Sequence, residues 1–290
     1  MEISPQARMG LVELSVSDLD RSLAYWQDAV GLRVLSREDG AAELGAGSVA
    51  GQADAARPED RPPTAATGVD TPLLRFVEEP GVRPADGFTG LFHVALLVPD
   101  RPSLGRFLAH AAREQIRLEG LSDHDVSEAI YLRDPDRHGI EIYADRPREQ
   151  WEGQVWERMT TKPLDAQSLL AEAGGDAFDG LPEGTTVGHV HLRVRDVDET
   201  IGFYRDTLGM GLTAQLGDQA AFLSAGGYHH HIGGNTWETR GATPAPEGTA
   251  RLLRFTIVLP DAAEVERVAG RIGGTEVRDP SGNPLALAAA

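Results

Sequence analysis

The chain has 290 residues, 41% of them hydrophobic, and its 45 acidic residues outnumber its 27 basic ones to give a net charge of −18. This charge repels phosphate groups, so it opposes binding to nucleic acid or to an anionic membrane and favours a small-molecule partner. Because cysteine is absent, disulfides and thiolate ligands are excluded, and any transition metal must be held by histidine and carboxylate. The sequence has no secretory pattern at its start and no long apolar run, so we expect a cytoplasmic location.

Residues 10–35 predict a strand, a helix and a second strand. They begin with alternating apolar and polar positions and then take on helical periodicity. Asp18 or Asp20 can cap the helix by accepting hydrogen bonds from its free N–H groups. Gly31 can end the helix in the left-handed conformation, which glycine adopts without steric cost.

The same order of elements returns in residues 188–213. Asp196 and Gly209 occupy the positions of the first cap and the first terminal glycine, and Tyr204 falls at the position of Trp26. A match in this many positions indicates an internal duplication.

Two further strand-then-helix openings start at Phe92 and at Arg254, and each continues to an Asp-Pro turn. The turns begin at Asp134 and at Asp279, and a short apolar strand follows each of them. The chain is therefore predicted to contain four copies of one unit, near residues 8–80, 90–145, 187–232 and 250–290.

Two segments interrupt this pattern. Residues 45–71 are rich in Ala, Gly, Pro and Asp, which predicts a flexible excursion inside the first unit. Residues 73–77 restore a strand. A long connection follows the second unit and contains a short helix near residues 165–173. The predicted organisation has three parts: an N-terminal pair of units in residues 1–145, a linker in residues 146–186 and a C-terminal pair in residues 187–290.

One hairpin collects residue types that bind metals and move protons. Tyr131 and Glu141 lie on either side of the Asp134-Pro135 turn, so adjacent antiparallel strands can present both side chains to one pocket. His124 precedes them in the same stretch. Taken alone, such a hairpin equally fits a half-buried aromatic and a solvated edge charge.

The four repeats, the GHVHL strand, the FHVALLVPD opening and the DPDRHGIEIY ending together resemble the vicinal oxygen chelate superfamily. The resemblance is greatest to its two-domain extradiol members of the catechol 2,3-dioxygenase type, and it covers nearly the whole chain outside the excursion and part of the linker. It implies an α+β fold in which four βαβββ modules pair, and their curved sheets enclose cavities. It also implies a metal held by two histidines and one glutamate.

The positions of the family pattern can be carried onto this sequence one by one. The first-strand ligand falls on His93 and His189, and the carboxylate falls on Glu141. The equivalent positions of the first and fourth units hold other residues: Leu11, Arg254 and Ala286. We therefore expect the second unit to pair with the third around a 2-His-1-carboxylate site, with the first and fourth as a ligandless scaffold. Such a site suits Fe(II) best, with Mn(II) or another divalent metal as the alternative.

The resemblance also assigns roles near the metal. The acid/base histidine falls on His230, and the second-sphere histidine and tyrosine fall on His124 and Tyr131. The His229–His231 run is expected on a strand, where residues 229 and 231 face one way and residue 230 the other, so at most one or two of them can reach the metal site. No catalytic or metal-binding role is assigned to two other histidines, because His110 is expected on a helix surface and His138 in a turn.

The expected activity is extradiol cleavage of a catechol-type aromatic by O₂. Two alternatives remain at this point. A glyoxalase I-like lyase or isomerase would use His230 as a fourth ligand, and a binding or resistance protein of the same fold would keep the cavity without turnover. Whether the chain forms a homo-oligomer is left open.

Overall fold

The structure is a computed structural model that describes residues 2–47, 71–175 and 177–290. Most of the predicted excursion, residues 48–70, lies outside the described residues. None of the helices in the described ranges combines the length and apolarity needed to cross a bilayer.

Each of the four units opens with a strand and a helix, and the same acidic cap joins the two. The aspartate that ends each strand accepts a hydrogen bond from the backbone N–H three residues later, which satisfies a free donor of the first helical turn. The four caps are Asp18, Asp100, Asp196 and Asp261. Gly31 adopts φ 86° at the end of the first helical segment, as predicted.

The first two units each contain four main strands and one helix. The first unit consists of β1 (Arg8–Val16), α1 (Leu19–Tyr25) with its π-helical continuation η1 (Trp26–Val30), β2 (Arg33–Glu38), β3 (Ala41–Gly45) and β4 (Leu74–Glu78). The second consists of β6 (Gly90–Leu97), α2 (Arg101–Arg113), β7 (Leu118–Asp123), β8 (Ser127–Arg133) and β9 (Gly139–Asp145). The short strand β5 (Arg83–Pro84) lies between them.

The third unit extends three residues past its predicted end, and the fourth has two strands after its helix where the others have three. The third unit consists of β11 (Thr186–Arg193), α5 (Val197–Ile201) with its continuation η4 (Gly202–Leu208), β12 (Gly211–Leu216), β13 (Ala220–Ser224) and β14 (Ile232–Asn235). The fourth consists of β16 (Leu252–Leu259), α6 (Ala262–Ile272), β17 (Glu276–Arg278) and β18 (Pro284–Ala289), preceded by the short strand β15 (Thr249–Ala250).

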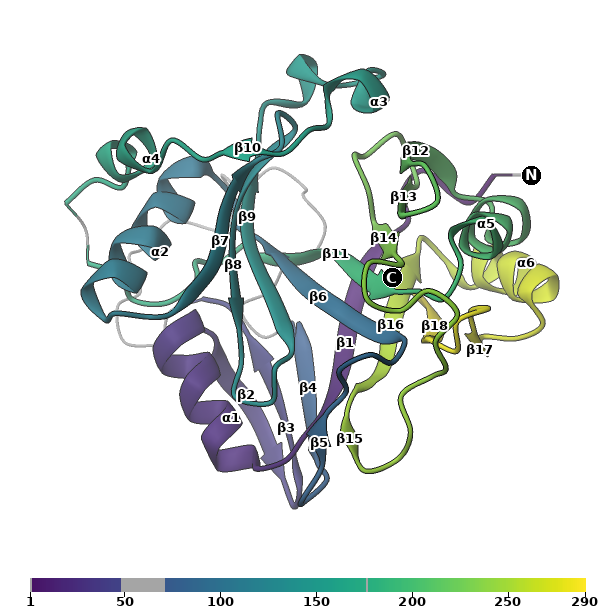
Figure 1. Cartoon of the computed structure of the whole chain (residues 1–290), viewed down its shortest axis with the longest axis horizontal. Helices are drawn as coiled ribbons and strands as arrows, with labels where there is room; N and C mark the ends of the chain where they lie inside the picture. The colour runs from purple at the N-terminus through teal and green to yellow at the C-terminus, as the bar shows by residue number, and fades with distance from the viewer. Residues whose placement is uncertain (1, 48–70, 176) are drawn as a thin grey trace.

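The units pair across the two halves of the chain. Strands β6 and β11 join the second and third units in a nine-stranded sheet, and strands β1 and β16 join the first and fourth in a seven-stranded sheet. Both seams run through the middle of the molecule, with α1 and α2 on one flank and α5 and α6 on the other (Figure 1). This is the pairing that the distribution of ligand residues predicts. The division of the chain into domains at residues 145 and 187 stays a prediction.

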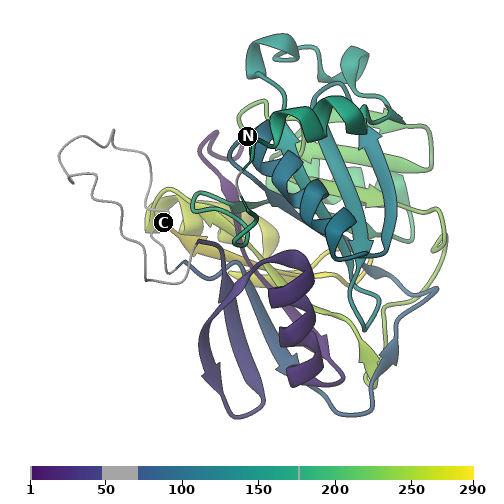
Figure 2. The same cartoon turned by 90° about the vertical axis from the view of Figure 1, so that its left-hand side faces the viewer.

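Within the first half, the units lie one above the other. Figure 2 shows the first unit in purple below the second in blue and teal, each with its helix toward the viewer. The linker between the halves contains the helix predicted near residues 165–173. Its elements are η3 (Arg148–Gln150), α3 (Val155–Arg158), β10 (Lys162–Pro163) and α4 (Ala166–Glu172). Strand β10 pairs with β7, so the linker is attached to the edge of the nine-stranded sheet.

Equivalent hydrogen bonds hold neighbouring units together in each half. Nε1 of Trp26 donates to the carboxylate of Asp134 at 3.2 Å, and the hydroxyl of Tyr204 donates to the carboxylate of Asp279 at 3.1 Å. Both acceptors belong to Asp-Pro turns and are buried. Burial raises the pKa of Asp279, although hydrogen bonds from Asn283 and Tyr204 act against the rise. Each turn thus anchors its own unit to the helical segment of the unit before it.

Replacing Tyr204 by phenylalanine is expected to lower the free energy of unfolding by about 1–3 kcal/mol, because the buried Asp279 carboxylate loses a donor. Denaturant unfolding measures the change. Tyr25→Phe is the matched control, since the Tyr25 hydroxyl is half-buried and has no hydrogen bond within the described part of the chain. That control should change stability by less than about 0.5 kcal/mol. Equal losses in both variants would contradict the anchoring role.

Of two histidine predictions, one is wrong and one is confirmed. His110 was expected on a helix surface but is buried, with Nε2 3.0 Å from the Asp28 carbonyl oxygen and its ring stacked 4.2 Å from that of Phe178. His138 does lie in the turn, yet it is also buried, and its Nε2 is 2.9 Å from the Ser15 carbonyl oxygen. Both side chains therefore fix contacts between segments that are distant in sequence.

Candidate metal centre

Three adjacent strands place the predicted ligands on one face of the nine-stranded sheet. Strand β6 lies between β9 and β11, and Ala95 on β6 is the register partner of both Glu141 and His189. His93 lies two residues before Ala95 on the same strand. Because residues two apart on a strand point to the same side, the three side chains meet above Ala95, which is small enough to leave them room.

The three predicted ligand atoms converge. Oε2 of Glu141 lies 2.8 Å from Nε2 of His93 and 3.0 Å from Nε2 of His189, and the two imidazole nitrogens are 3.3 Å apart. All three side chains are buried. Within the described ranges, this is the cluster of His and carboxylate groups whose ligand atoms lie close enough together to hold one ion.

The electrostatics of the cluster favour the ionisation states that a cation needs. Burial alone would raise the pKa of Glu141, but the neighbouring His189 and His93 outweigh it and hold that pKa well below its ordinary value. Burial lowers the pKa of His189 to about 4, with Glu141 acting in the opposite direction. An ionised carboxylate beside an unprotonated imidazole supplies lone pairs to a metal, so the donor set fits a divalent transition metal.

The second-sphere pair lies beside this cluster. Tyr131 and Glu141 are register partners in the β8–β9 hairpin, so both side chains point to the same face, as the sequence predicts. Nε2 of His124 is 2.8 Å from the Tyr131 hydroxyl, and its Nδ1 is 2.7 Å from the carbonyl oxygen of Thr160 in the linker. Burial, followed by the charge of Glu141, raises the pKa of Tyr131 well above its usual value.

The histidine run does not continue a strand, contrary to the expectation. Residues 229–231 belong to the loop between β13 and β14, and the three side chains take three directions. His230 lines the cavity, with its ring 4.0 Å from that of His189. His229 contacts Asp145 instead, and Nδ1 of His231 accepts a hydrogen bond from the backbone N–H of Ala225. Burial lowers the pKa of His230 well below that of a free imidazole.

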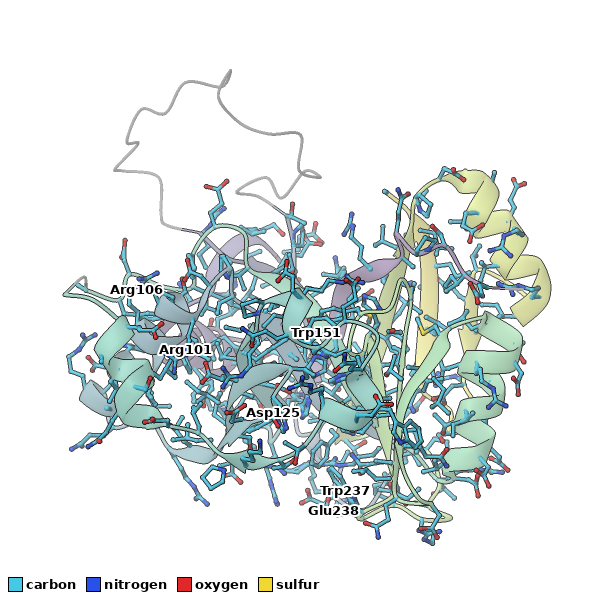
Figure 3. The ribbon with its side chains drawn as sticks, turned by 90° about the horizontal axis from the view of Figure 1, so that it is seen from above. Arg101, Arg106, Asp125, Trp151, Trp237 and Glu238 are labelled. Atoms are coloured by element: carbon cyan, nitrogen blue, oxygen red, sulfur yellow. The ribbon has the colours of Figure 1, made fainter. Side chains whose placement is uncertain are left out.

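A cavity of about 660 Å³ opens above the cluster. Aromatic rings from several elements line it, and the linker supplies one wall. The aromatic lining residues are Phe92, Tyr131, Trp156, Phe222 and Trp237, and the linker supplies Trp156 together with Met159, Thr160 and Thr161. Trp237 is half exposed and lies beside Glu238 at one edge of the molecule (Figure 3). The cavity is large enough for a substituted single aromatic ring, and its aromatic walls suit one.

Several residues around the cavity were not predicted from the sequence. His191 lines it, and its ring lies 4.9 Å from that of His93. Gly233 on the next strand makes room for this ring, because a Cβ there would come within 3.0 Å of it. The position two residues after His189 on one strand was a usable signal for His191. The linker residues carried no comparable signal.

The pseudo-equivalent place between the first and fourth units holds an ion pair in place of ligands. Nε of Arg254 lies 2.7 Å from a carboxylate oxygen of Glu13, and a second guanidinium nitrogen is 2.6 Å from Glu276. Ala286 stands where the carboxylate would be. The loss of ligands predicted there agrees with this arrangement.

The chain matches the family model of the Glyoxalase/Bleomycin resistance protein/Dioxygenase superfamily over residues 8–142 and 186–250. It belongs to this superfamily, and the predicted resemblance and α+β fold are confirmed.

A curated relative, the catechol-2,3-dioxygenase of Bacillus subtilis (strain 168), is 41% identical over 277 residues, which cover 93% of this chain and 89% of the relative. Among solved structures, a Bacillus subtilis protein described provisionally as a dioxygenase aligns with a TM-score of 0.63 and 14% identity, covering 100% of this chain and 86% of that one. Glyoxalase I from Zea mays aligns with a TM-score of 0.53 and 18% identity, covering 97% and 92%. Both structural likenesses concern the fold alone.

Proposed function

We propose that the protein is an extradiol ring-cleaving dioxygenase that acts on a catechol-type aromatic with O₂. The observation that carries the proposal is the convergence of His93, Glu141 and His189 beneath an aromatic-walled cavity. It occurs in a chain 41% identical to a catechol-2,3-dioxygenase, and that similarity makes this chain an oxidoreductase of the same type.

His93, Glu141 and His189 would hold the metal, for which we propose Fe(II), with Mn(II) as an alternative that the same ligands accept. When bound, such an ion supplies open coordination positions for a catecholate and for O₂ and lets electrons pass between them. The protein contributes a buried, largely apolar site, which strengthens every polar contact made inside it.

His230 is the proposed acid/base residue. It lines the cavity beside His189, where an imidazole nitrogen can take a proton from a catechol hydroxyl and later return it. The aromatic ring of Phe222, 5.1 Å from that of His230, holds the imidazole against the cavity wall.

His124 and Tyr131 form the opposite side of the proposed site. The Thr160 carbonyl can only accept, so Nδ1 of His124 carries the proton and Nε2 of the neutral ring accepts from the Tyr131 hydroxyl. This contact orients the Tyr131 hydroxyl, which lines the cavity and would donate a hydrogen bond to a substrate oxygen.

A glyoxalase I-like activity is the second candidate. The 4.0 Å separation of the His189 and His230 rings would allow His230 to complete a four-ligand set, and the fold matches that of glyoxalase I from Zea mays. The binding-protein alternative has no comparable support, because a pure binding cavity does not need three converging ligand atoms.

Protein loaded with Fe(II) under anaerobic conditions and then exposed to air is expected to turn catechols yellow, since extradiol ring opening gives a conjugated product. Absorbance and oxygen uptake measure this over a series of substituted catechols, with metal-free protein as the control. Formation of lactoylglutathione from methylglyoxal and glutathione, without ring cleavage, would instead select the glyoxalase candidate. The cytoplasmic location stays a prediction.

A further inference from the structure

A chain of hydrogen-bonding groups leads from His230 away from the cavity. Nδ1 of His230 lies 2.8 Å from Nδ1 of His229, and Nε2 of His229 lies 2.9 Å from Oδ1 of Asp145. The His229 side chain is fully buried, whereas the Asp145 side chain is 26% exposed at the end of β9. The contacts connect the third unit to the second at a point next to the candidate metal centre.

The direction of each hydrogen bond follows from which group can donate. A carboxylate has only lone pairs, so Nε2 of His229 must carry the proton that Asp145 accepts. The hydroxyl of Tyr228 donates to the same Oδ1 at 3.2 Å. The Nδ1–Nδ1 contact of 2.8 Å needs one donor and one acceptor, and we assign the acceptor to Nδ1 of His229, which carries a lone pair when the ring holds its single proton at Nε2. With this assignment His230 donates through its own Nδ1–H, and its Nε2 carries no proton.

The surroundings hold His229 in the orientation that this chain of bonds requires. Its ring lies 4.0 Å from that of Tyr228 and 5.6 Å from that of Trp151. Trp151 is buried and lies near the middle of the view in Figure 3. Across the part of the chain that the structure describes, Nε2 of His230 has no hydrogen-bond partner, while the residue lines the cavity. The unprotonated nitrogen is therefore available on the cavity side.

We propose that Asp145 and His229 are positioning residues that fix His230 in the Nδ1–H tautomer, so that a bare Nε2 faces the substrate. The opposite tautomer would present an N–H group to a catechol hydroxyl and could not accept its proton there. The catalytic consequence rests on the proposed function, whereas the tautomer is a property of the protein itself.

The test reads the tautomer directly. Protein labelled with ¹⁵N-histidine and loaded with Zn²⁺, a diamagnetic ion that takes His and carboxylate ligands, is examined by long-range ¹H–¹⁵N NMR, with His230→Gln to assign the signals. We expect a proton on Nδ1 of His230 and none on Nε2. Asp145→Asn can donate where the carboxylate only accepts, so it should produce a population of His230 with the proton on Nε2.

Kinetics of the Fe(II)-loaded variants supply the second readout. Asp145→Asn should lower kcat about tenfold or more with little change in KM or metal content, because the acid/base group is in the wrong form for part of the time. Asp145→Glu keeps a carboxylate, so this variant should keep the proton of His230 on Nδ1 and retain most of the kcat of the unaltered protein. Tyr228→Phe is the matched control, since it removes another donor to the same Asp145 oxygen but keeps the ring that packs against His229.

Two results would overturn the inference: a proton on Nε2 of His230 in the unaltered protein, or an Asp145→Asn variant whose His230 keeps its proton entirely on Nδ1. If the expected tautomer is found but no catechol is cleaved, the positioning inference stands and the proposed dioxygenase function fails. The NMR result therefore separates the two hypotheses.

Discussion

Replacing Glu141 by glutamine is expected to abolish both metal binding and turnover. Glutamine keeps the shape of the side chain but removes the one negative charge among three converging ligand atoms, and a neutral amide oxygen is a poor ligand for a divalent cation. Metal content of protein purified without chelator measures the first loss, and oxygen uptake with catechol measures the second.

Thermal unfolding gives an independent measure of the same loss. A ligand that binds only the folded protein stabilises it by about 2.7 kcal/mol at a hundred times its Kd. Adding Fe(II), Mn(II) or Zn(II) should therefore raise the melting temperature of the unaltered protein and leave that of Glu141→Gln unchanged.

Glu128→Gln is the matched control, because Glu128 is an equally buried carboxylate on the neighbouring strand β8. It pairs with Arg101 and Arg146 and takes no part in the converging cluster. We expect that variant to lose some stability and keep its metal. Stoichiometric metal in Glu141→Gln would show that the ion is held somewhere else.

Replacing His230 by alanine is expected to leave the metal in place and to lower kcat by about 10²- to 10⁴-fold, the usual contribution of a positioned acid/base group. The predicted ligand set is complete without His230, and its ring lies to one side of that set, 4.0 Å from the ring of His189. The measurement pairs metal analysis with steady-state kinetics on the same preparation.

His231→Gln controls for the loss of any histidine from the run. Its Nδ1 accepts from the backbone N–H of Ala225, so the residue supports the loop and faces away from the cavity. Turnover in that variant should stay near the unaltered level. Should His230→Ala lose metal while His231→Gln keeps it, His230 is a ligand and the glyoxalase candidate gains support.

The elements that could be predicted from the sequence depend on interactions between near neighbours. The caps at Asp18 and Asp196 bond backbone groups three residues away, so their chemistry is visible in a short window. The convergence of His93, Glu141 and His189 involves distant residues, and it was predicted from the resemblance to the family, whose ligand positions fall on these three residues.

The features that could not be predicted depend on distant partners. The sequence around His110 predicts a surface position, but the ring of Phe178 in the linker stacks on it. The residues next to either ring give no indication of this contact. The orientation of the His229 side chain depends on its hydrogen bond to Asp145, which lies 84 positions earlier in the chain. Likewise, Trp156 and Met159 form a cavity wall only because the linker returns over the nine-stranded sheet.

The seams between the halves also affect how the protein can be made. During synthesis, β1 stays unpaired along this edge until its partner β16 has been made, and β6 stays unpaired until β11 has been made. At about 5–20 residues per second, the wait for β16 lasts roughly 10–50 s. Unpaired apolar strand edges invite association with other chains in that interval. A nascent chain that stalls in the linker exposes the unpaired edges of β1 and β6 at the same time. We therefore expect the need for a chaperone to be greatest when only the first half has been synthesised.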